Sequence, residues 1–167
     1  MPVKNENIEE RVIALLKEKK YVISAAESCT GGLFLATLIN VSGASDVIKE
    51  GFVTYAEEAK VKRLGVKPDT LATYTAVSEQ TAKEMAEGLQ VVTGADVAVS
   101  ITGLAGPGGG TEEIPVGTVF VGCCCKEHVT VKKLQLQGDR FTIRQKAVEE
   151  ALFLVEQSLG VENGRDV

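Results

Sequence analysis

A short segment, residues 25–32, brings a hydroxyl group to the end of an apolar stretch. Ser28 follows residues typical of a buried strand, and Gly31 and Gly32 precede an apolar pattern with helical spacing. A turn from strand to helix exposes such a hydroxyl at the carboxyl edge of a sheet, beside the free N–H groups of a helix start. The segment therefore predicts either a nucleophilic or anion-binding corner, or a tight turn without chemistry.

Lys60 is the candidate for the base that a nucleophilic Ser28 would need. The one histidine, His128, falls in a predicted hairpin turn away from the corner, so a Ser-His-Asp triad is not expected. Lys60 lies near the start of a short predicted helix, where the helix dipole and exclusion of water would both lower the pKa of its amine. Tyr55 precedes this helix and could bridge the serine and the lysine. A solvated basic helix face is the alternative interpretation of Lys60.

Two further segments could contact an anionic ligand. The loop of residues 103–113 is rich in glycine, but it lacks the Gly-Lys-Ser/Thr sequence of a Walker A motif and carries two glutamates. Arg140 and Arg144 lie one turn apart at the start of the last predicted helix, so two guanidinium groups on one face could bind a phosphate. A flexible loop and local ion pairs are the alternatives.

Hydrophobic periodicity predicts an α/β fold with helices on both faces of a mixed sheet. The predicted strands are residues 21–27, 51–55, 95–102, 117–125 and 129–136. The predicted helices are residues 5–20, 31–41, 56–64, 69–73, 79–92 and 140–159. Three candidate residues then lie at one carboxyl edge of the sheet: Ser28, Tyr55 and Thr102.

Length, composition and charge exclude several classes of protein function. The 167 residues, of which 44% are hydrophobic, predict a single domain over residues 1–167 with a core at about 5–158. No apolar stretch approaches the roughly 20 residues of a membrane span, and the charged start lacks a signal sequence, so a cytoplasmic protein without a membrane partner is expected. The net charge of −5 argues against nucleic acid as a partner. The cysteines, Cys29 and 123–125, lack metal-ligand spacing and are predicted to be core residues.

Seven segments in order resemble the CinA carboxyl-terminal domain family, which includes stand-alone nicotinamide mononucleotide (NMN) deamidases. They are residues 26–32, 51–55, 58–60, 76–78, 103–109, 115–118 and 138–140. The resemblance covers about residues 5–158. It implies a three-layer α/β/α sandwich whose five-stranded mixed sheet has one antiparallel strand. It also implies hydrolysis of NMN to nicotinate mononucleotide and ammonia, in pyridine nucleotide salvage, with no cofactor and no metal.

The resemblance assigns catalytic roles to Ser28, Tyr55 and Lys60. In the predicted mechanism, neutral Lys60 takes the proton of Ser28, and N–H groups of residues 29–31 bind the oxyanion. Attack by an activated water is the variant of this mechanism. The residues predicted to bind substrate are Cys29, Thr30, Gly31, Gly32, Ser45, Thr102, Gly103, Gly106, Arg140 and Arg144.

Two other function classes stay open beside the NMN deamidase. One is a non-catalytic nucleotide-binding or regulatory module, and the other is an amidase acting on a different small amide. A homo-oligomer is expected, because small single-domain enzymes are commonly symmetric oligomers.

The sequence departs from the family pattern at four positions. Thr102 replaces a common serine, Thr75 a glycine, Glu57 a frequent asparagine, and Ile114 a frequent lysine. The missing lysine removes one possible phosphate contact, which predicts weaker affinity for NMN more than a loss of catalysis.

Overall fold

The described sheet of this protein has five strands, of which one runs antiparallel to the others. The computed structural model describes residues 6–163, and the side chains of residues 6–160. The strands are β1 (Ile23–Glu27), β2 (Phe52–Val53), β3 (Val97–Gly103), β4 (Thr118–Cys125) and β5 (His128–Gln135), in the order β2-β1-β3-β4-β5. β1 pairs in parallel with β2 and β3, whereas β4 is antiparallel to β3 and to β5. The predicted mixed sheet with one antiparallel strand is confirmed.

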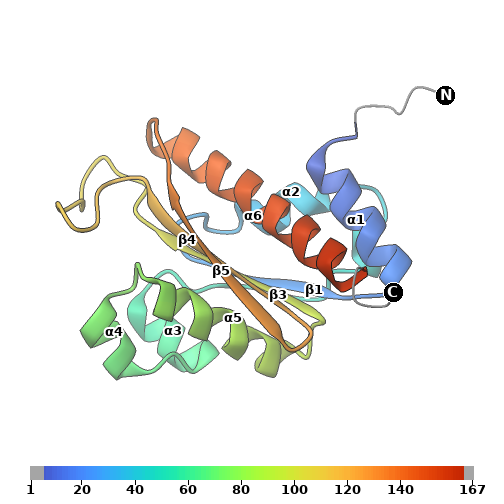
Figure 1. The fold of residues 1–167 in the computed structure, drawn as a ribbon, viewed down its shortest axis with the longest axis horizontal. Coiled ribbons are helices and arrows are strands. Elements are labelled where there is room, and N and C mark those ends of the chain that lie inside the picture. The colour runs from blue at the N-terminus through green and yellow to red at the C-terminus, as the bar shows by residue number, and fades with distance from the viewer. Residues whose placement is uncertain (1–5, 164–167) are drawn as a thin grey trace.

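Helices cover both faces of this sheet and make three layers (Figure 1). On one face lie α1 (Ile8–Lys19), α2 (Leu33–Ile39) and α6 (Arg140–Asn163), and on the other lie α3 (Glu57–Leu64), α4 (Pro68–Tyr74) and α5 (Glu79–Thr93). A short 3-10 helix, η1 (Ala44–Asp46), follows α2. The predicted α/β/α sandwich is confirmed.

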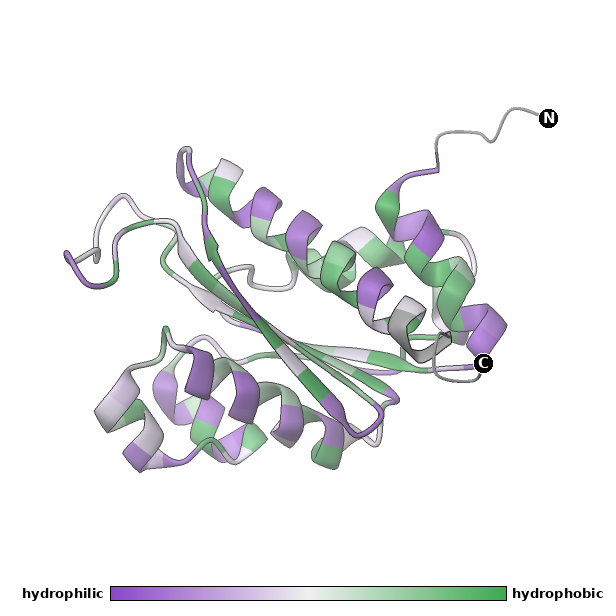
Figure 2. Cartoon of the chain, in the orientation of Figure 1, coloured by the Kyte–Doolittle hydropathy of each residue, from purple (hydrophilic) through white to green (hydrophobic). Residues whose placement is uncertain are grey.

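Side-chain burial follows the sequence pattern. All five residues of β1 and all eight of β4 are buried, as expected for central strands covered on both faces. The helices turn their hydrophobic residues toward the sheet and their charged residues outward (Figure 2). The three consecutive cysteines of β4 are buried, as predicted.

The turn before α2 is longer than predicted. The helix was expected from residue 31, but it begins at Leu33. Gly31 and Gly32 have φ values of 57° and 106°, which are left-handed conformations that do not fit an α-helix. A turn of several residues therefore separates Ser28 from the first turn of α2. β2 is also shorter than predicted, with two residues.

The sheet has a topological switch point at β1. The chain leaves β1 toward β2 on one side and returns through α3, α4 and α5 to β3 on the other. In open α/β sheets, ligands bind at the carboxyl ends of the strands where the direction of winding reverses. Ser28 directly follows the last residue of β1, so it lies at this position.

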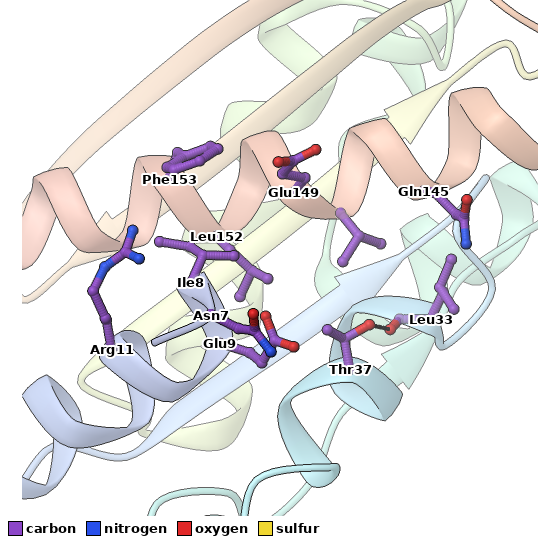
Figure 3. A pocket seen from close by; sticks show the side chains of 11 residues that line it. Asn7, Ile8, Glu9, Arg11, Leu33, Thr37, Gln145, Glu149, Leu152 and Phe153 are labelled. Atoms are coloured by element: carbon purple, nitrogen blue, oxygen red, sulfur yellow. Dashed lines mark hydrogen bonds between the residues drawn. The ribbon is translucent and has the colours of Figure 1, made fainter. Parts of the chain in front are cut away.

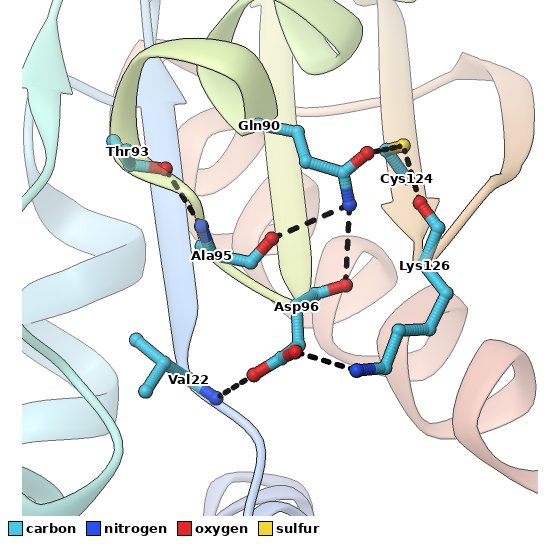
Figure 4. A network of polar contacts seen from close by, with 7 residues as sticks. All are labelled: Val22, Gln90, Thr93, Ala95, Asp96, Cys124 and Lys126. Atoms are coloured by element: carbon cyan, nitrogen blue, oxygen red, sulfur yellow. Dashed lines mark hydrogen bonds and ion pairs between the residues drawn. The ribbon is translucent and has the colours of Figure 1, made fainter.

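Polar contacts connect the segments at the other end of the sheet, where β1 and β3 begin. The Asp96 carboxylate accepts hydrogen bonds from the Val22 N–H at 2.9 Å and from Lys126 Nζ at 2.6 Å (Figure 4). Gln90 Nε2 donates to the carbonyl oxygen atoms of Ala95 and Asp96 at the same place. These contacts join the amino ends of β1 and β3 to the β4–β5 turn and have a structural role.

A groove lies between α1, α2 and α6, and its walls carry both apolar and charged side chains (Figure 3). None of the predicted site residues lines it. Among the described residues, the helices include none with the length and hydrophobicity needed to cross a bilayer.

Candidate active site

Ser28 and Lys60 meet in the interior of the protein. Lys60 Nζ lies 3.0 Å from Ser28 Oγ, and only 1% of the Lys60 residue is exposed. The amine also donates to the carbonyl oxygen of Thr54 at 2.7 Å and to that of Tyr55 at 3.2 Å. The structure therefore brings together the predicted nucleophile and base, although they are 32 positions apart in the chain.

The surroundings of the Lys60 amine suit its neutral form. A neutral amine has two N–H donors and one lone pair, which match the two carbonyl oxygens and the hydroxyl of Ser28. Burial lowers the pKa of Lys60, while the nearby charge of Glu57 acts in the opposite direction. When the amine takes up a proton, its third N–H group faces Ser28 Oγ. The site can thus hold both protonation states of a general base without movement.

Helix α3 places this amine. Lys60 is the fourth residue of α3, and its side chain points back toward the start of the helix, where Thr54 and Tyr55 end the preceding segment. Gly88 of α5 lets α3 lie close, because a Cβ atom there would collide with the Leu64 carbonyl. The lysine is therefore held at the sheet edge by packing between α3 and α5.

Tyr55 contacts the serine–lysine pair through its main-chain carbonyl group. Its carbonyl oxygen lies 3.2 Å from Lys60 Nζ and 3.5 Å from Ser28 Oγ. Its phenol does not lie between these groups, because the phenol oxygen accepts a hydrogen bond from Arg140 Nη2 at 3.3 Å and the residue is 63% exposed. The predicted phenol bridge between serine and lysine is absent from this arrangement.

The carboxylate of Glu27 fixes the corner after β1, a role that is not among the predictions from the sequence. Glu27 is 1% exposed and accepts hydrogen bonds from the main-chain N–H groups of Phe34 at 2.7 Å and Leu35 at 3.2 Å. The start of α2 is therefore occupied by this carboxylate and does not offer those N–H groups to a ligand. An acidic residue at the end of a strand of small and apolar residues was the signal available in the sequence.

The two arginines of α6 contact protein groups. Arg140 donates from Nη1 to the Gly106 carbonyl oxygen at 2.7 Å and from Nη2 to the phenol of Tyr55. Arg144 donates from Nε to the Cys29 carbonyl oxygen at 2.9 Å and from Nη2 to that of Thr30 at 3.0 Å. Arg140 lies at the rim, beside the glycine loop, whereas Arg144 is tied to the corner itself.

Steric constraints explain why glycine stands at positions 103 and 106, which were predicted to bind substrate. A Cβ at Gly103 would come within 2.6 Å of Val119 and 2.8 Å of the Thr118 carbonyl oxygen, because β3 and β4 are in contact there. Gly106 has a φ of 76° and brings its carbonyl to Arg140.

The side chains of Thr102, Cys29 and Thr30 are buried in the site. The Thr102 hydroxyl donates to the Ala76 carbonyl oxygen at 2.7 Å, so it fixes the end of β3 to the α4–α5 turn. Burial raises the pKa of the Cys29 thiol to about 11, which leaves it protonated and unreactive beside Ser28. The hydroxyls of Thr30 and Thr54 are buried, and neither has a hydrogen-bond partner among the described residues.

The structure does not bring Ser45 to the site, contrary to the expectation. Ser45 belongs to η1, and the next segment is fixed to the start of β1, where the Ile23 N–H donates to the Val47 carbonyl oxygen at 2.8 Å. Ser28 lies at the other end of β1, about 17 Å from Ile23 at the usual rise per strand residue. Ser45 is exposed at this amino end.

Comparison with known proteins decides the family. The CinA C-terminal domain family matches residues 5–159. The chain belongs to this family. A CinA-like protein from Kosmotoga olearia is 52% identical over 157 residues, which are 94% of this chain and 38% of that protein. This CinA-family chain thus spans less than two fifths of the length of that relative.

Solved structures of the CinA superfamily share the fold. A competence-damaged protein (CinA) superfamily protein from Klebsiella pneumoniae has a TM-score of 0.89 and 33% identity, covering 93% of this chain and 99% of that one. The competence/damage inducible protein CihA from Agrobacterium tumefaciens has a TM-score of 0.88 and 39% identity, covering 96% of this chain and 99% of that one. The sandwich described above is therefore the CinA fold.

Proposed function

We propose that this CinA-family chain is an amidohydrolase that uses Ser28 as nucleophile and Lys60 as general base. The observation that carries the proposal is the 3.0 Å contact between the serine hydroxyl and a buried lysine amine of lowered pKa. Serine and lysine pairs of this kind activate a nucleophile without histidine. Among the described residues, no group of three His, Cys, Asp or Glu side chains could hold a metal ion.

The reaction proceeds in two halves. Ser28 Oγ attacks the carboxamide carbon while its proton moves to Lys60 Nζ, and the carbonyl oxygen takes the negative charge. The C–N bond then breaks, and Lys60 returns the proton to the leaving nitrogen, which departs as ammonia. Water next attacks the ester carbon and gives a proton to Lys60. Cleavage of the ester bond returns this proton to Ser28 Oγ and releases the carboxylic acid.

The proposed substrate is NMN, and the product is nicotinate mononucleotide. Support for NMN comes from the sequence resemblance to NMN deamidases and from the position of Arg140. This guanidinium lies at the rim between the phenol of Tyr55 and the glycine loop, where it could bind a substrate phosphate. A pathway role in pyridine nucleotide salvage follows from the same substrate.

The decisive experiment is an assay of ammonia release from purified protein and NMN. Ser28→Ala should lower the rate at least about 10³-fold, because the nucleophile is lost. Ser158→Ala is the matched control, since this hydroxyl donates to the Leu154 carbonyl oxygen within α6 and is remote from the corner. A wild-type protein that binds NMN without releasing ammonia would instead support a non-catalytic nucleotide-binding module.

A panel of substrates separates NMN from other small amides. The proposal predicts that removing the 5′-phosphate, as in nicotinamide riboside, raises KM, while a neutral amide without the ribose is hydrolysed poorly. Faster turnover of an unrelated amide would favour the broader amidase.

The acyl-enzyme can be distinguished from direct attack by water. With Ser28 as nucleophile, hydroxylamine traps a hydroxamate and an initial burst of ammonia precedes steady-state turnover when deacylation is slow. A serine that only activates water gives neither result.

A further inference from the structure

Arg144 lies behind the corner that carries Ser28. Its guanidinium reaches from α6 to two carbonyl oxygens, those of Cys29 and Thr30, which are 115 and 114 positions away in the sequence. None of the ion pairs between described residues involves Arg144. Its charge is therefore used on two main-chain carbonyls of the corner, where charge-assisted hydrogen bonds are strong and the rigid fork fixes both directions.

This contact sets the direction of one particular N–H group. A trans peptide unit is planar, and its C=O and N–H groups point in opposite directions. The only cis peptide among the described residues is Gly106–Pro107, so the corner peptides are trans. Because Arg144 holds the Cys29 carbonyl, the N–H of Thr30 points away from the guanidinium.

Several other N–H groups near Ser28 already have acceptors within the protein. Those of Phe34 and Leu35 donate to Glu27, and that of Gly31 donates to the Ser28 carbonyl oxygen at 3.1 Å. Within the described part of the chain, the N–H of Thr30 has no main-chain acceptor. It is thus available to a ligand one peptide beyond the nucleophile.

We propose that Arg144 is a positioning residue that orients the Thr30 N–H toward the oxyanion formed when Ser28 attacks. The inference rests on the proposed amidohydrolase function and adds to it the support that Arg144 gives to one of the predicted oxyanion donors, the N–H of Thr30. The guanidinium also polarises the Cys29–Thr30 peptide, because hydrogen bonds in a chain strengthen one another, and this makes the Thr30 N–H a stronger donor. Arg144 acts through this peptide and does not touch the substrate phosphate.

Steady-state kinetics of Arg144→Met and Arg144→Lys test this role. For Arg144→Met we expect kcat to fall about 10- to 100-fold, by the same factor with NMN and with nicotinamide riboside, while KM changes less than about twofold. Arg144→Lys keeps a charged donor and should recover part of kcat. The acid limb of the pH profile should not move, because Lys60 remains in place.

Lys146→Met is the matched control on the same helix. Lys146 also donates to a carbonyl oxygen, that of Gln137, at 2.8 Å, but it is exposed and distant from Ser28. We expect its kcat and KM to equal those of the wild type. A rise in KM for NMN alone in Arg144→Met, with kcat retained, would overturn the inference and assign Arg144 to the phosphate. Unchanged kinetics with lowered thermal stability would also overturn it.

A second readout separates this inference from the proposed function. Fluorophosphonates react when a serine Oγ forms a bond to phosphorus and fluoride leaves, and the phosphoryl oxygen takes the place of the oxyanion. If wild-type protein does not hydrolyse NMN, the proposed substrate is wrong, yet labelling of Ser28 still reports on the corner. We expect labelling at least about 10-fold slower in Arg144→Met than in Lys146→Met. Equal rates, or no labelling of the wild type, would overturn the inference.

Discussion

Ser28 Oγ and Lys60 Nζ lie 3.0 Å apart, with the amine also bound by the carbonyl oxygens of Thr54 and Tyr55. The contact joins the end of β1 to the first turn of α3, and 1% exposure of Lys60 keeps water from competing for it. Each of the following predictions changes one feature of this pair or of the corner that carries it.

Lys60→Met should remove activity without unfolding the protein. The thioether fills a similar volume and carries no buried charge, which offsets the loss of two hydrogen bonds to carbonyl oxygens, each worth about 1 kcal/mol. We expect ammonia release to fall at least about 10³-fold, while the free energy of unfolding changes by less than about 2 kcal/mol. Denaturant unfolding and the ammonia assay measure both quantities. Retained turnover in this variant would remove lysine from the mechanism.

The lowered pKa of Lys60 makes stability rise with pH. In the unfolded chain the amine keeps its proton up to about pH 10.4, whereas the buried amine loses it at lower pH. Between these two values the unfolded state binds more protons, so the free energy of unfolding increases with pH. Lys60→Met should lack this contribution. The check is the difference in unfolding free energy between wild type and Lys60→Met at several pH values up to 10, which should grow in favour of the wild type.

Glu57→Gln should move the acid limb of the pH–rate profile to lower pH. Burial lowers the pKa of Lys60, and the negative charge of Glu57 partly opposes that effect. Removing the charge should lower the pKa of the amine further, so the active neutral form appears at lower pH. The neighbouring Glu58→Gln is the control. Equal shifts in the two variants would show a general effect of surface charge.

Glu27→Gln should weaken the hydrogen bonds that fix the turn between β1 and α2. The carboxylate accepts two main-chain N–H groups of α2, whereas an amide has one oxygen acceptor and turns its NH2 toward the second N–H. We expect a loss of about 1 to 3 kcal/mol in unfolding free energy and a lower kcat. Urea denaturation measures the first, with Glu149→Gln on the exposed face of α6 as the control. A change in stability equal to that of the control would contradict the role given to Glu27.

Alkylation of thiols should leave the native protein active. Burial raises the pKa of Cys29 to about 11, so the reactive thiolate is about 10⁻³ of the population at pH 8. Iodoacetamide at pH 8 should not slow ammonia release, and mass spectrometry should find Cys29 unmodified. Denatured protein, in which all four cysteines become accessible, is the positive control. Inhibition together with modification of Cys29 would point to a thiol at the reacting centre.

Much of the fold could be predicted from the sequence because each element carries its own pattern. The near-continuous apolar residues of β3 indicated a central strand, and the stripe of Ala82, Met85 and Leu89 indicated the inner face of α5. Boundaries were less accurate where backbone conformation decided them. Gly31 and Gly32 matched an apolar helix start in the sequence, yet their positive φ values delay the helix to Leu33.

The candidate site was predictable only in its residue types. A hydroxyl at a strand end and a lysine near a helix start were visible as isolated features of the chain, and the family resemblance added that they belong together. The sequence did not indicate that Tyr55 contributes its carbonyl, because any residue has one. It also suggested Ser45, which the connection after α2 places at the opposite end of β1.

By itself, the sequence determined the number and order of the strands and α-helices and the presence of a serine and a lysine suited to each other's chemistry. Those properties arise from local periodicity and side-chain type. Tertiary structure alone decided that the Lys60 amine is buried among three oxygens, that Glu27 occupies the start of α2, and that Arg144 binds the corner instead of standing open to a phosphate. These contacts join residues distant in the chain, and their directions depend on how α3 and α6 pack against the edge of the sheet.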